Sequence, residues 1–436
     1  MPILAGFQLA YLYDLFRESP GFPFFFAVTN YFLDLIQYWF NTQARFLSNM
    51  FQFTQLPPLA LYIHFPWCVQ KCPYCDFNSH KLNDNLDEQR YIDALIQDLE
   101  QELPRIWGRS IHTIFMGGGT PSLFSPESMD RLISALRARL VISADAEITM
   151  EANPGTIEAG RFYEYFNVGI NRLSIGVQSF HDDQLTALGR IHDRKQAIKA
   201  IETAHAAGFS NFNLDLMFSL PGQNPKSALE DVHTAIDLEP AHISYYQLTL
   251  EPNTLFYKFP PTLPDDDAAW DMQQMAQRTL ASAGYTQYEV SAYAKNNHRS
   301  RHNLNYWTFG DYLGIGAGAH DKISDAQQQT ITRQWKQKHP ERYLETLRSS
   351  DRIAGSRTLE MKETVFEFMM NALRLCDGIE TPLFSQHTGL PLILAEPGLR
   401  AAAKQQWINW DSHKIVPTQN GQQYLNDVLE LFLPND

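Results

Sequence analysis

The chain has 436 residues, with 35 Lys and Arg against 49 Asp and Glu, so its formal net charge is −14. A chain of this length can bury a large core and is long enough for two or three domains. Hydrophobic residues at 44% and charged residues at 19% exclude a disordered chain. The acidity argues against nucleic-acid binding, because phosphate recognition depends on clustered Lys and Arg.

The beginning of the chain is rich in aromatic residues: residues 1–55 hold 16 of the 55 Phe, Trp and Tyr side chains. Pro20, Pro23 and Asp34 interrupt its apolar run, so it is a poor transmembrane helix, and it lacks the basic start of a secretory signal. Residues 24–40 predict a helix with an aromatic face, suited to a membrane surface or another domain. Alternatively, translation starts at Met50. We treat residues 1–56 as an N-terminal extension.

From residue 59 onward, short strand-like runs alternate with helical patterns. Strands are expected at 59–65, 111–116, 147–150, 172–177, 212–218 and 242–250, and Asn85 is expected to cap the first helix. Such alternation predicts βαβ units with a parallel sheet. Six units predict an α/β fold, a (β/α) partial barrel, whose site lies at the carboxyl ends of the strands. This core domain is predicted to span residues 57–322.

After residue 322 the pattern changes to short helices with a small hairpin. Helices are expected at 341–347, 361–375, 390–402 and 422–432, with an extended stretch at 407–416. This arrangement predicts a mainly helical, winged-helix-like domain over residues 323–436. Because it contains no basic helix, a protein-contact or lid role is favoured over DNA contact.

The loop directly after the first predicted strand carries three of the four cysteines: Cys68, Cys72 and Cys75. Three thiols within eight residues indicate a metal or cluster site in a reducing compartment rather than a disulfide framework. A zinc site would need a fourth ligand, such as His64 or His80. Three closely spaced thiolates instead suit a [4Fe–4S] cluster with one iron free of protein ligands. Cys376 is interpreted as a buried small apolar residue.

The cysteine loop, with Tyr74 before its third cysteine, resembles the radical S-adenosylmethionine (SAM) superfamily. The runs at 62–68 (YIHFPWC) and 176–178 (GVQ) are similar to the subgroup that contains oxygen-independent coproporphyrinogen III oxidase and the HemW-type heme chaperones. The resemblance covers residues 57 to 430. It implies a [4Fe–4S] cluster held by the three cysteines, with SAM bound at the open iron.

The resemblance also implies which residues hold SAM. Those expected around the cofactor are Tyr62, Tyr74, Gly118, Gly119, Thr120 and Glu151, and those lining the same pocket are Gln178, Arg190 and Asp215. Glycines let the backbone approach a ligand closely, and Glu151 can pair with a cationic group of SAM. Taken singly, Glu151 or Asp215 would more often be a solvated acid at a strand end. Their joint occurrence at successive strand ends is what favours a site.

One residue separates the two relatives. The oxidase pattern carries a fourth Cys two positions after the third, whereas Phe77 stands there in this sequence, as it does in HemW-type proteins. The resemblance therefore implies a cytoplasmic heme chaperone that passes heme to acceptor hemoproteins, expected to be respiratory enzymes near the membrane. Coproporphyrinogen III oxidation, a step of porphyrin metabolism, is the alternative.

The run His302–Trp307 (HNLNYW) matches an HNxxYW motif that HemW-type proteins associate with heme. We expect His302 as the first heme contact and Tyr306 as the second, because imidazole and phenol groups ligate heme iron and positions four apart share a helix face. Without the resemblance, a turn and a core Trp would be the simpler interpretation. A basic cluster just upstream is expected to pair with the heme propionates: Lys295, Arg299 and Arg301.

Overall fold

The computed structural model describes residues 51–82, 86–155 and 160–434. The predicted helix at 24–40, Met50 and the predicted cap Asn85 lie outside these ranges. All six predicted strands are confirmed: β1 (Leu59–Phe65), β4 (Ser110–Gly118), β5 (Val141–Ala152), β6 (Arg172–Gln178), β7 (Phe212–Phe218) and β8 (His242–Gln247). They lie parallel to one another in this order, so their carboxyl ends share one edge of the sheet.

The sheet is extended at both ends by further strands, and all of them except β11 (Asp311–Ile315) run antiparallel to the strand before them in the sheet. On one side, β11 lies parallel to β1, and β12 (His320–Asp325), β13 (Thr330–Lys336) and β14 (Ile353–Thr358) follow it antiparallel. On the other side, β10 (Ala292–Ala294) and β9 (Thr286–Glu289) follow β8. The order is β14-β13-β12-β11-β1-β4-β5-β6-β7-β8-β10-β9. The sheet thus runs on past residue 322, where we expected the core domain to end.

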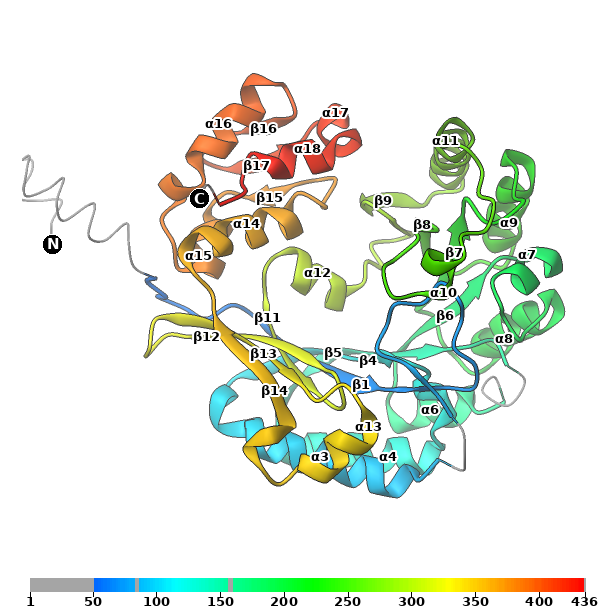
Figure 1. The fold of residues 1–436 in the computed structure, drawn as a ribbon, viewed down its shortest axis with the longest axis horizontal. Helices are drawn as coiled ribbons and strands as arrows, with labels where there is room; N and C mark the ends of the chain where they lie inside the picture. Colours follow the sequence, from blue (N-terminus) through cyan, green and yellow to red (C-terminus); the bar gives the residue numbers. More distant parts are fainter. Residues whose placement is uncertain (1–50, 83–85, 156–159, 435–436) are drawn as a thin grey trace, which may run out of the picture. The chain divides into compact units, whose positions relative to one another are not determined.

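Helices cover the outer face of the parallel strands, as Figure 1 shows for α3, α4 and α6. The outer helices are α3 (Glu88–Glu102), α4 (Pro126–Arg139), α6 (Phe162–Val168), α7 (Asp182–Ala187), α8 (Arg194–Ala206), α9 (Pro225–Asp237) and α11 (Asp266–Ser282). Asp87 caps α3 by accepting from the Arg90 N–H, and Ser125 caps α4 by accepting from the Ser128 N–H, with Pro126 at its first position. On the opposite, inner face lies α12 (Arg301–Trp307).

The chain ends in a small helical domain with its own apolar core, which includes Phe368, Phe384 and Leu399. Its elements are α14 (Met361–Ala372), β15 (Ile379–Glu380), α15 (Pro382–Thr388), α16 (Glu396–Lys404), β16 (Ile408–Trp410), β17 (Lys414–Pro417), α17 (Gln419–Gln423) and α18 (Leu425–Glu430). The β16–β17 hairpin and the short helices confirm the winged-helix-like pattern. Within the described ranges, no helix has the length and apolarity to cross a membrane.

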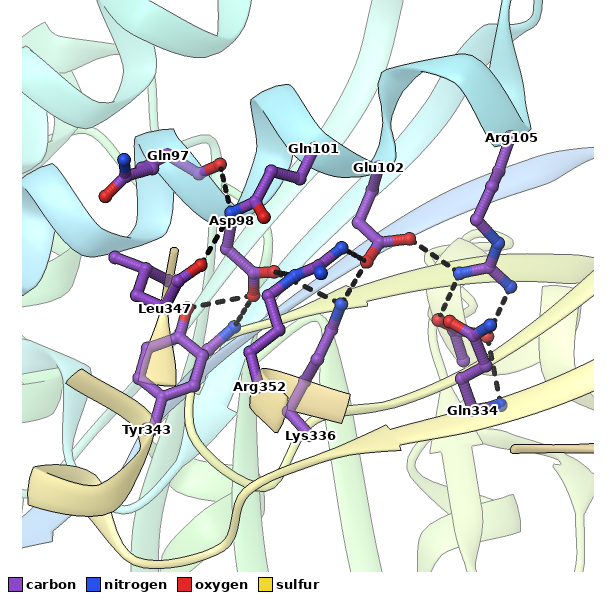
Figure 2. Close-up of polar contacts among 12 residues, drawn as sticks. Gln97, Asp98, Gln101, Glu102, Arg105, Gln334, Lys336, Tyr343, Leu347 and Arg352 are labelled. Carbon is purple, nitrogen blue, oxygen red and sulfur yellow. Dashed lines mark hydrogen bonds and ion pairs between the residues drawn. The ribbon is translucent and has the colours of Figure 1, made fainter. Parts of the chain in front are cut away.

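A buried cluster of charges joins α3 to the antiparallel extension (Figure 2). Asp98 and Glu102 on α3 have side chains that are 0% and 1% exposed. Lys336 of β13 contacts both acids, at 3.1 Å from Asp98 Oδ1. Arg352 Nη2 lies 2.8 Å from Glu102 Oε1, and Arg105 Nη1 donates to the same carboxylate at 2.7 Å. Burial alone would raise the pKa of Glu102, but the charges and hydrogen bonds of Lys336 and Arg105 together outweigh it and lower this pKa to about 2.

Replacing Lys336 by Met should strongly destabilise the fold, because two buried acids would lose the fully buried cation that contacts both, and Arg352 would remain as their shared partner. We expect the free energy of unfolding to fall by roughly 3–5 kcal/mol, the usual cost of removing one partner of a buried ion pair. Urea unfolding followed by circular dichroism measures it. Arg342→Ala removes a pair in which both side chains are more than half exposed, at 54% and 63%, and should change stability by less than about 0.5 kcal/mol. Equal effects would contradict a structural role for the buried cluster.

Candidate functional site

The cysteine loop is closed by two short parallel strands, β2 (Trp67–Cys68) and β3 (His80–Lys81). Within it, the Cys75 N–H donates to the Cys72 carbonyl at 3.2 Å. Each cysteine sulfur lies near a polar group from a different element: Thr120 Oγ1 at 3.5 Å from Cys68, Arg190 Nη1 at 3.6 Å from Cys72 and Ser79 Oγ at 3.9 Å from Cys75. Burial raises the pKa of the Cys68 and Cys75 thiols. The neighbouring donors favour the thiolate form that metals bind.

The two histidines considered as zinc ligands have other partners. His64 Nδ1 lies 2.9 Å from the Tyr62 hydroxyl, and its Nε2 lies 2.8 Å from the Asn78 carbonyl oxygen. Burial lowers the pKa of His64 to about 4, so its ring is neutral. His80 Nε2 lies 3.3 Å from the Asn78 side-chain oxygen. In the described part of the chain, no three His, Cys, Asp or Glu side chains are arranged to hold a single metal ion.

A cavity of about 380 Å³ lies beside the cysteine loop, at the carboxyl edge of the parallel strands. Its lining includes the three cysteines and most residues expected to hold SAM: Tyr74, Gly118, Gly119, Thr120, Glu151, Gln178, Arg190 and Asp215. The parallel register brings these positions together although they span more than a hundred residues of sequence.

The glycine run at the end of β4 packs directly against the end of β1 and the start of β2, where the cysteine loop begins. The Gly119 N–H donates to the Phe65 carbonyl and the Thr120 N–H to the Trp67 carbonyl, both at 2.7 Å. A Cβ on Gly119 would lie 2.5 Å from the Trp67 oxygen, closer than any side chain allows. We expected these glycines to make room for a ligand; at Gly119 the room is needed by the backbone of the cysteine loop.

Two acids, Glu151 on β5 and Asp215 on β7, face this cavity beside the cysteine loop. Glu151 accepts from the Gly118 N–H at 3.0 Å, and Asp215 accepts from Ser174 Oγ at 3.1 Å and Asn213 Nδ2 at 2.8 Å. Burial, together with the charge of Asp215, raises the pKa of Glu151 to about 8. Neither acid has a cationic partner within ion-pair distance among the described residues. A positively charged ligand group would therefore find an acid ready to ionise.

Arg190 connects the thiol of Cys72 to two strand ends. Its Nη2 donates to Asn153 Oδ1 at 2.7 Å and to the Gly176 carbonyl at 2.8 Å. Nearby, Gln178 ends β6 with φ 69°, a left-handed conformation that a non-glycine residue adopts at a cost. Sequence reasoning missed Asn153, as it missed Tyr246, whose hydroxyl donates to Gln178 at 2.9 Å. Both follow or end strands, so the strand-end rule could have found them.

A second cavity, of about 980 Å³, lies on the other side of the cysteine loop. The two cavities share a wall made of Cys75, Asp76, Phe77, Ser79, Gly118 and Glu151. Phe77, which stands where the oxidase pattern has its fourth cysteine, is 57% exposed and lines both cavities. Further lining comes from β1, the cysteine loop and the segment after β8. The antiparallel extension, α12 and α14 also contribute, with residues that include Tyr306, Trp307, Tyr312, His320, Arg333, Lys338 and Met370.

The expected heme-contact residues take different positions. Tyr306 lines the larger cavity, and so does Tyr62, which we expected beside SAM. His302 is 1% exposed and lies behind Tyr306. Its Nδ1 lies 2.9 Å from Thr113 Oγ1 and its Nε2 lies 2.9 Å from the Tyr306 hydroxyl. Burial lowers the pKa of His302 to about 3, so its neutral ring is committed to hydrogen bonds.

In the part of the chain that the structure describes, the basic cluster expected to bind propionates does not line either cavity, and its three cations have other partners. Arg299 Nη2 pairs with Asp377 at 2.7 Å, Arg301 Nη2 pairs with Asp145 at 3.2 Å, and Lys295 Nζ lies 4.5 Å from the centre of the Tyr285 ring. None of the three is among the described residues that line either cavity. Their partners come from distant segments, which hold these cations at the surface.

The cations that do line the larger cavity were missed by the sequence reasoning: Lys71, Lys322, Arg333 and Lys338. His320 lies among them, since burial and then the charges of Lys338 and Arg333 lower its pKa. Lys71 lies inside the cysteine loop, Lys322 on β12, Arg333 on β13 and Lys338 in the loop after β13. Arg333 and Lys338 fall in the region that we had assigned to a helical domain, and no local pattern marked these two as neighbours of the cysteine loop.

The fold and the cysteine loop define a radical SAM protein. The sequence matches the family model for the radical SAM superfamily over residues 62–235 and the model for the HemN C-terminal domain over residues 359–424. The solved structure of coproporphyrinogen III oxidase from Escherichia coli has the same fold, with a TM-score of 0.73 at 24% identity, and the match covers 86% of this chain and 90% of that one.

Two proteins named heme chaperone HemW are each 48% identical to this chain. The match to the Escherichia coli protein covers 87% of this chain and 99% of that protein, and the match to the Haemophilus influenzae protein covers 88% and 100%. The Bacillus subtilis protein of the same name is 33% identical, over 86% of this chain and 99% of its own length. The chain belongs to the HemW family.

Replacing Glu151 by Gln should stabilise the SAM-free protein, increasingly so as the pH rises. The folded-state pKa of about 8 exceeds the ordinary value of 4.5, so in this range the folded chain binds one proton more than the unfolded chain. Wild-type stability therefore falls as the pH rises from about 5 to 8, and the Gln variant lacks this loss. Thermal unfolding across that range, with Glu341→Gln as an exposed control, measures the difference. A gap that does not change with pH would contradict the buried-acid interpretation.

Proposed function

We propose that this protein is a cytoplasmic heme chaperone: it binds heme, transfers it to acceptor hemoproteins, and carries a [4Fe–4S] cluster and SAM. Membership of the HemW family supports the heme role. The acceptors that we propose are respiratory enzymes, and delivery to them would involve peripheral contact with a membrane.

The residues around the smaller cavity fit the cluster and SAM. Cys68, Cys72 and Cys75 would ligate three irons of the cluster, leaving the fourth iron for SAM. Their donor set is all thiolate, and Thr120, Ser79 and Arg190 place hydrogen-bond donors beside the sulfurs. When bound, a reduced cluster supplies an electron to SAM.

The chain's own residues would orient SAM. Glu151 is a buried acid without a cationic partner in the described structure, so it would accept the ammonium group of SAM, whose charge would restore the carboxylate form. Gly118, Gly119 and Thr120 would frame the same end of the cavity. Gln178, Arg190, Asp215 and Tyr74 would line its remaining walls.

The observation that carries the proposal is the shared wall between the two cavities. The larger one, at about 980 Å³, is at the upper end of ordinary ligand sites and adjoins the cysteine loop through Cys75 and Phe77. A large cofactor and the cluster could thus be held side by side. Tyr306 and Trp307 contribute aromatic surface to this cavity, and such surface suits a flat macrocycle.

The second candidate function is oxygen-independent oxidation of coproporphyrinogen III, which the shared fold alone would allow. The observation against it is Phe77. A cysteine in its place would put a fourth thiol in the wall between the cavities, whereas the phenyl ring offers neither a ligand nor a proton donor.

Anaerobically reconstituted protein should be brown, with a broad absorbance at about 400 nm from a thiolate-bound cluster. A variant with all three loop cysteines replaced by Ala should lose this absorbance and the bound iron. Cys376→Ala is the matched control, since it removes the fourth cysteine and should leave iron and sulfide content unchanged. Zinc in place of iron in the wild type, or an unchanged spectrum in the triple variant, would contradict the cluster assignment.

The reconstituted wild type should bind hemin and should not convert coproporphyrinogen III in the presence of SAM and a reductant. Hemin titration followed at the Soret band tests the first expectation. Chromatography of the tetrapyrrole products tests the second, with an authentic coproporphyrinogen oxidase as the positive control. Vinyl product at sustained turnover would reject the chaperone assignment in favour of the oxidase.

A further inference from the structure

The larger cavity has a local excess of positive groups in an acidic chain. Its charged lining consists of Lys71, Lys322, Arg333 and Lys338 against Asp76 and Glu151. Burial and then the charge of Asp215 raise the pKa of Glu151 to about 8, so this acid contributes little negative charge at neutral pH. Since the whole chain carries −14, the cavity attracts anions where most of the surface repels them.

Among the residues that the structure describes, two of these four cations are paired with acids: Lys322 and Arg333 contact carboxylates at 2.8 Å and 2.6 Å. In the same part of the chain, Lys71 Nζ donates to two backbone carbonyls, at 3.0 Å and 3.1 Å, and has no acidic partner. In the described ranges, Lys338 Nζ has no ion-pair partner. The charge of Lys71 acts on the His80 ring, and the charge of Lys338 acts on the His320 ring; both histidines and both lysines line the cavity. Two ammonium groups that line one cavity fit a ligand with two carboxylates.

The histidines at this cavity differ in which ring nitrogens are used. His64 and the deeper His302 are hydrogen-bonded through both nitrogens, and His80 contacts the Asn78 side chain and the Lys338 backbone. His320 makes no ring hydrogen bond to any described residue. Of the four, only His320 keeps a nitrogen lone pair available without breaking an existing contact.

The tyrosine hydroxyls of the lining are also occupied. Tyr62 contacts His64 at 2.9 Å, Tyr306 contacts His302 at 2.9 Å, and Tyr312 accepts from Arg333 Nη1 at 2.7 Å. The Met370 thioether on α14 is the other available donor of a type that ligates heme iron. It is a softer and weaker ligand than a neutral imidazole.

Stacking rather than hydrogen bonding orients the His320 ring. His320 is the first residue of β12 and lies opposite Trp335 on β13. The two rings stack with centres 6.0 Å apart and planes at 20°. The Trp335 ring in turn packs against Gly355. Any side chain at position 355 would clash with it, because a Cβ there would lie 2.1 Å from the ring. The imidazole is thus held at the cavity wall while its nitrogens stay free.

We propose that the larger cavity binds an iron tetrapyrrole, with the His320 imidazole as iron ligand and the Lys338 and Lys71 ammonium groups as partners of its two carboxylates. This inference rests on the proposed heme chaperone function and assigns its ligand site. His302 then acts as a positioning residue, since it holds the Tyr306 hydroxyl that lines the same cavity.

The iron ligand is tested on cluster-loaded protein titrated with hemin. In His320→Ala, the Soret band and the electron paramagnetic resonance signal of the ferric heme should shift from their wild-type positions, and added imidazole should reverse the shift. Iron-free protoporphyrin IX should bind the wild type and this variant equally. Controls are His413→Ala, which alters an exposed histidine in the β16–β17 hairpin, and Met370→Leu.

The carboxylate partners are tested with hemin and its dimethyl ester. Lys338→Gln should weaken hemin binding about ten-fold, the value of one charge-assisted hydrogen bond. The same variant should bind the ester as the wild type does, because the ester has no carboxylates to lose. Lys404→Gln, which removes an exposed lysine of α16, should change neither affinity. Lys71→Gln, which also removes contacts inside the cysteine loop, is judged by the same ratio of hemin to ester affinity.

The possible outcomes separate this inference from the function on which it rests. Wild-type protein that binds no hemin would reject the chaperone function and this site together. Hemin binding with an unchanged spectrum in His320→Ala, or a spectrum that shifts only in Met370→Leu or His302→Ala, would leave the function standing and overturn His320 as ligand. Equal weakening of hemin and ester in Lys338→Gln would overturn the carboxylate contact.

Discussion

Asp98 and Glu102 are two acids whose side chains are buried away from water. The fold tolerates them because three cations contact them: Lys336, Arg352 and Arg105. A buried charge is costly unless a partner comes with it, so α3 and β13 can pack only in the register that brings these groups together. This constraint joins the antiparallel extension to the helical layer of the barrel. Figure 2 shows Lys336 of β13 among these charges. The cavity wall formed by β12 and β13 is positioned as a consequence, because His320 lies on β12 and Arg333 on β13, the strand that Lys336 anchors.

A second constraint acts at the carboxyl end of β1, where the cysteine loop begins. Asn78 joins this loop to the extension, since its side chain donates to the Lys338 carbonyl at 2.9 Å and to the Ala317 carbonyl at 3.0 Å, while its own carbonyl meets His64. The glycines of β4 hold the loop from the other side. The smaller cavity therefore opens toward the barrel and the larger one toward the extension, with the loop as their common wall.

The barrel was predictable from sequence because it follows from local pattern plus one topological rule: each strand shows as a short apolar run, and parallel strands must end at a shared edge. The family resemblance singled out Gly118, Glu151, Gln178 and Asp215, and the same rule explains why these residues lie together. The larger cavity depends on pairings that no local pattern records. The hydrogen bond that occupies His302 Nδ1 comes from Thr113, 189 residues away in the sequence. The surface position of Arg301 is likewise decided by Asp145, which no spacing rule connects to it.

Phe77 links the two cavities and the two candidate functions. It was recognised in the sequence only as a missing cysteine, yet its ring is 57% exposed and lines both cavities. An exposed phenyl ring leaves apolar surface in water, which proteins tend to retain where a ligand or partner covers it. A flat macrocycle in the larger cavity would cover this face and lose contact if a smaller, polar thiol replaced the ring. The substitution that removes a reactive group from the wall thus also supplies apolar surface, which suits a site that holds a tetrapyrrole rather than one that transforms it.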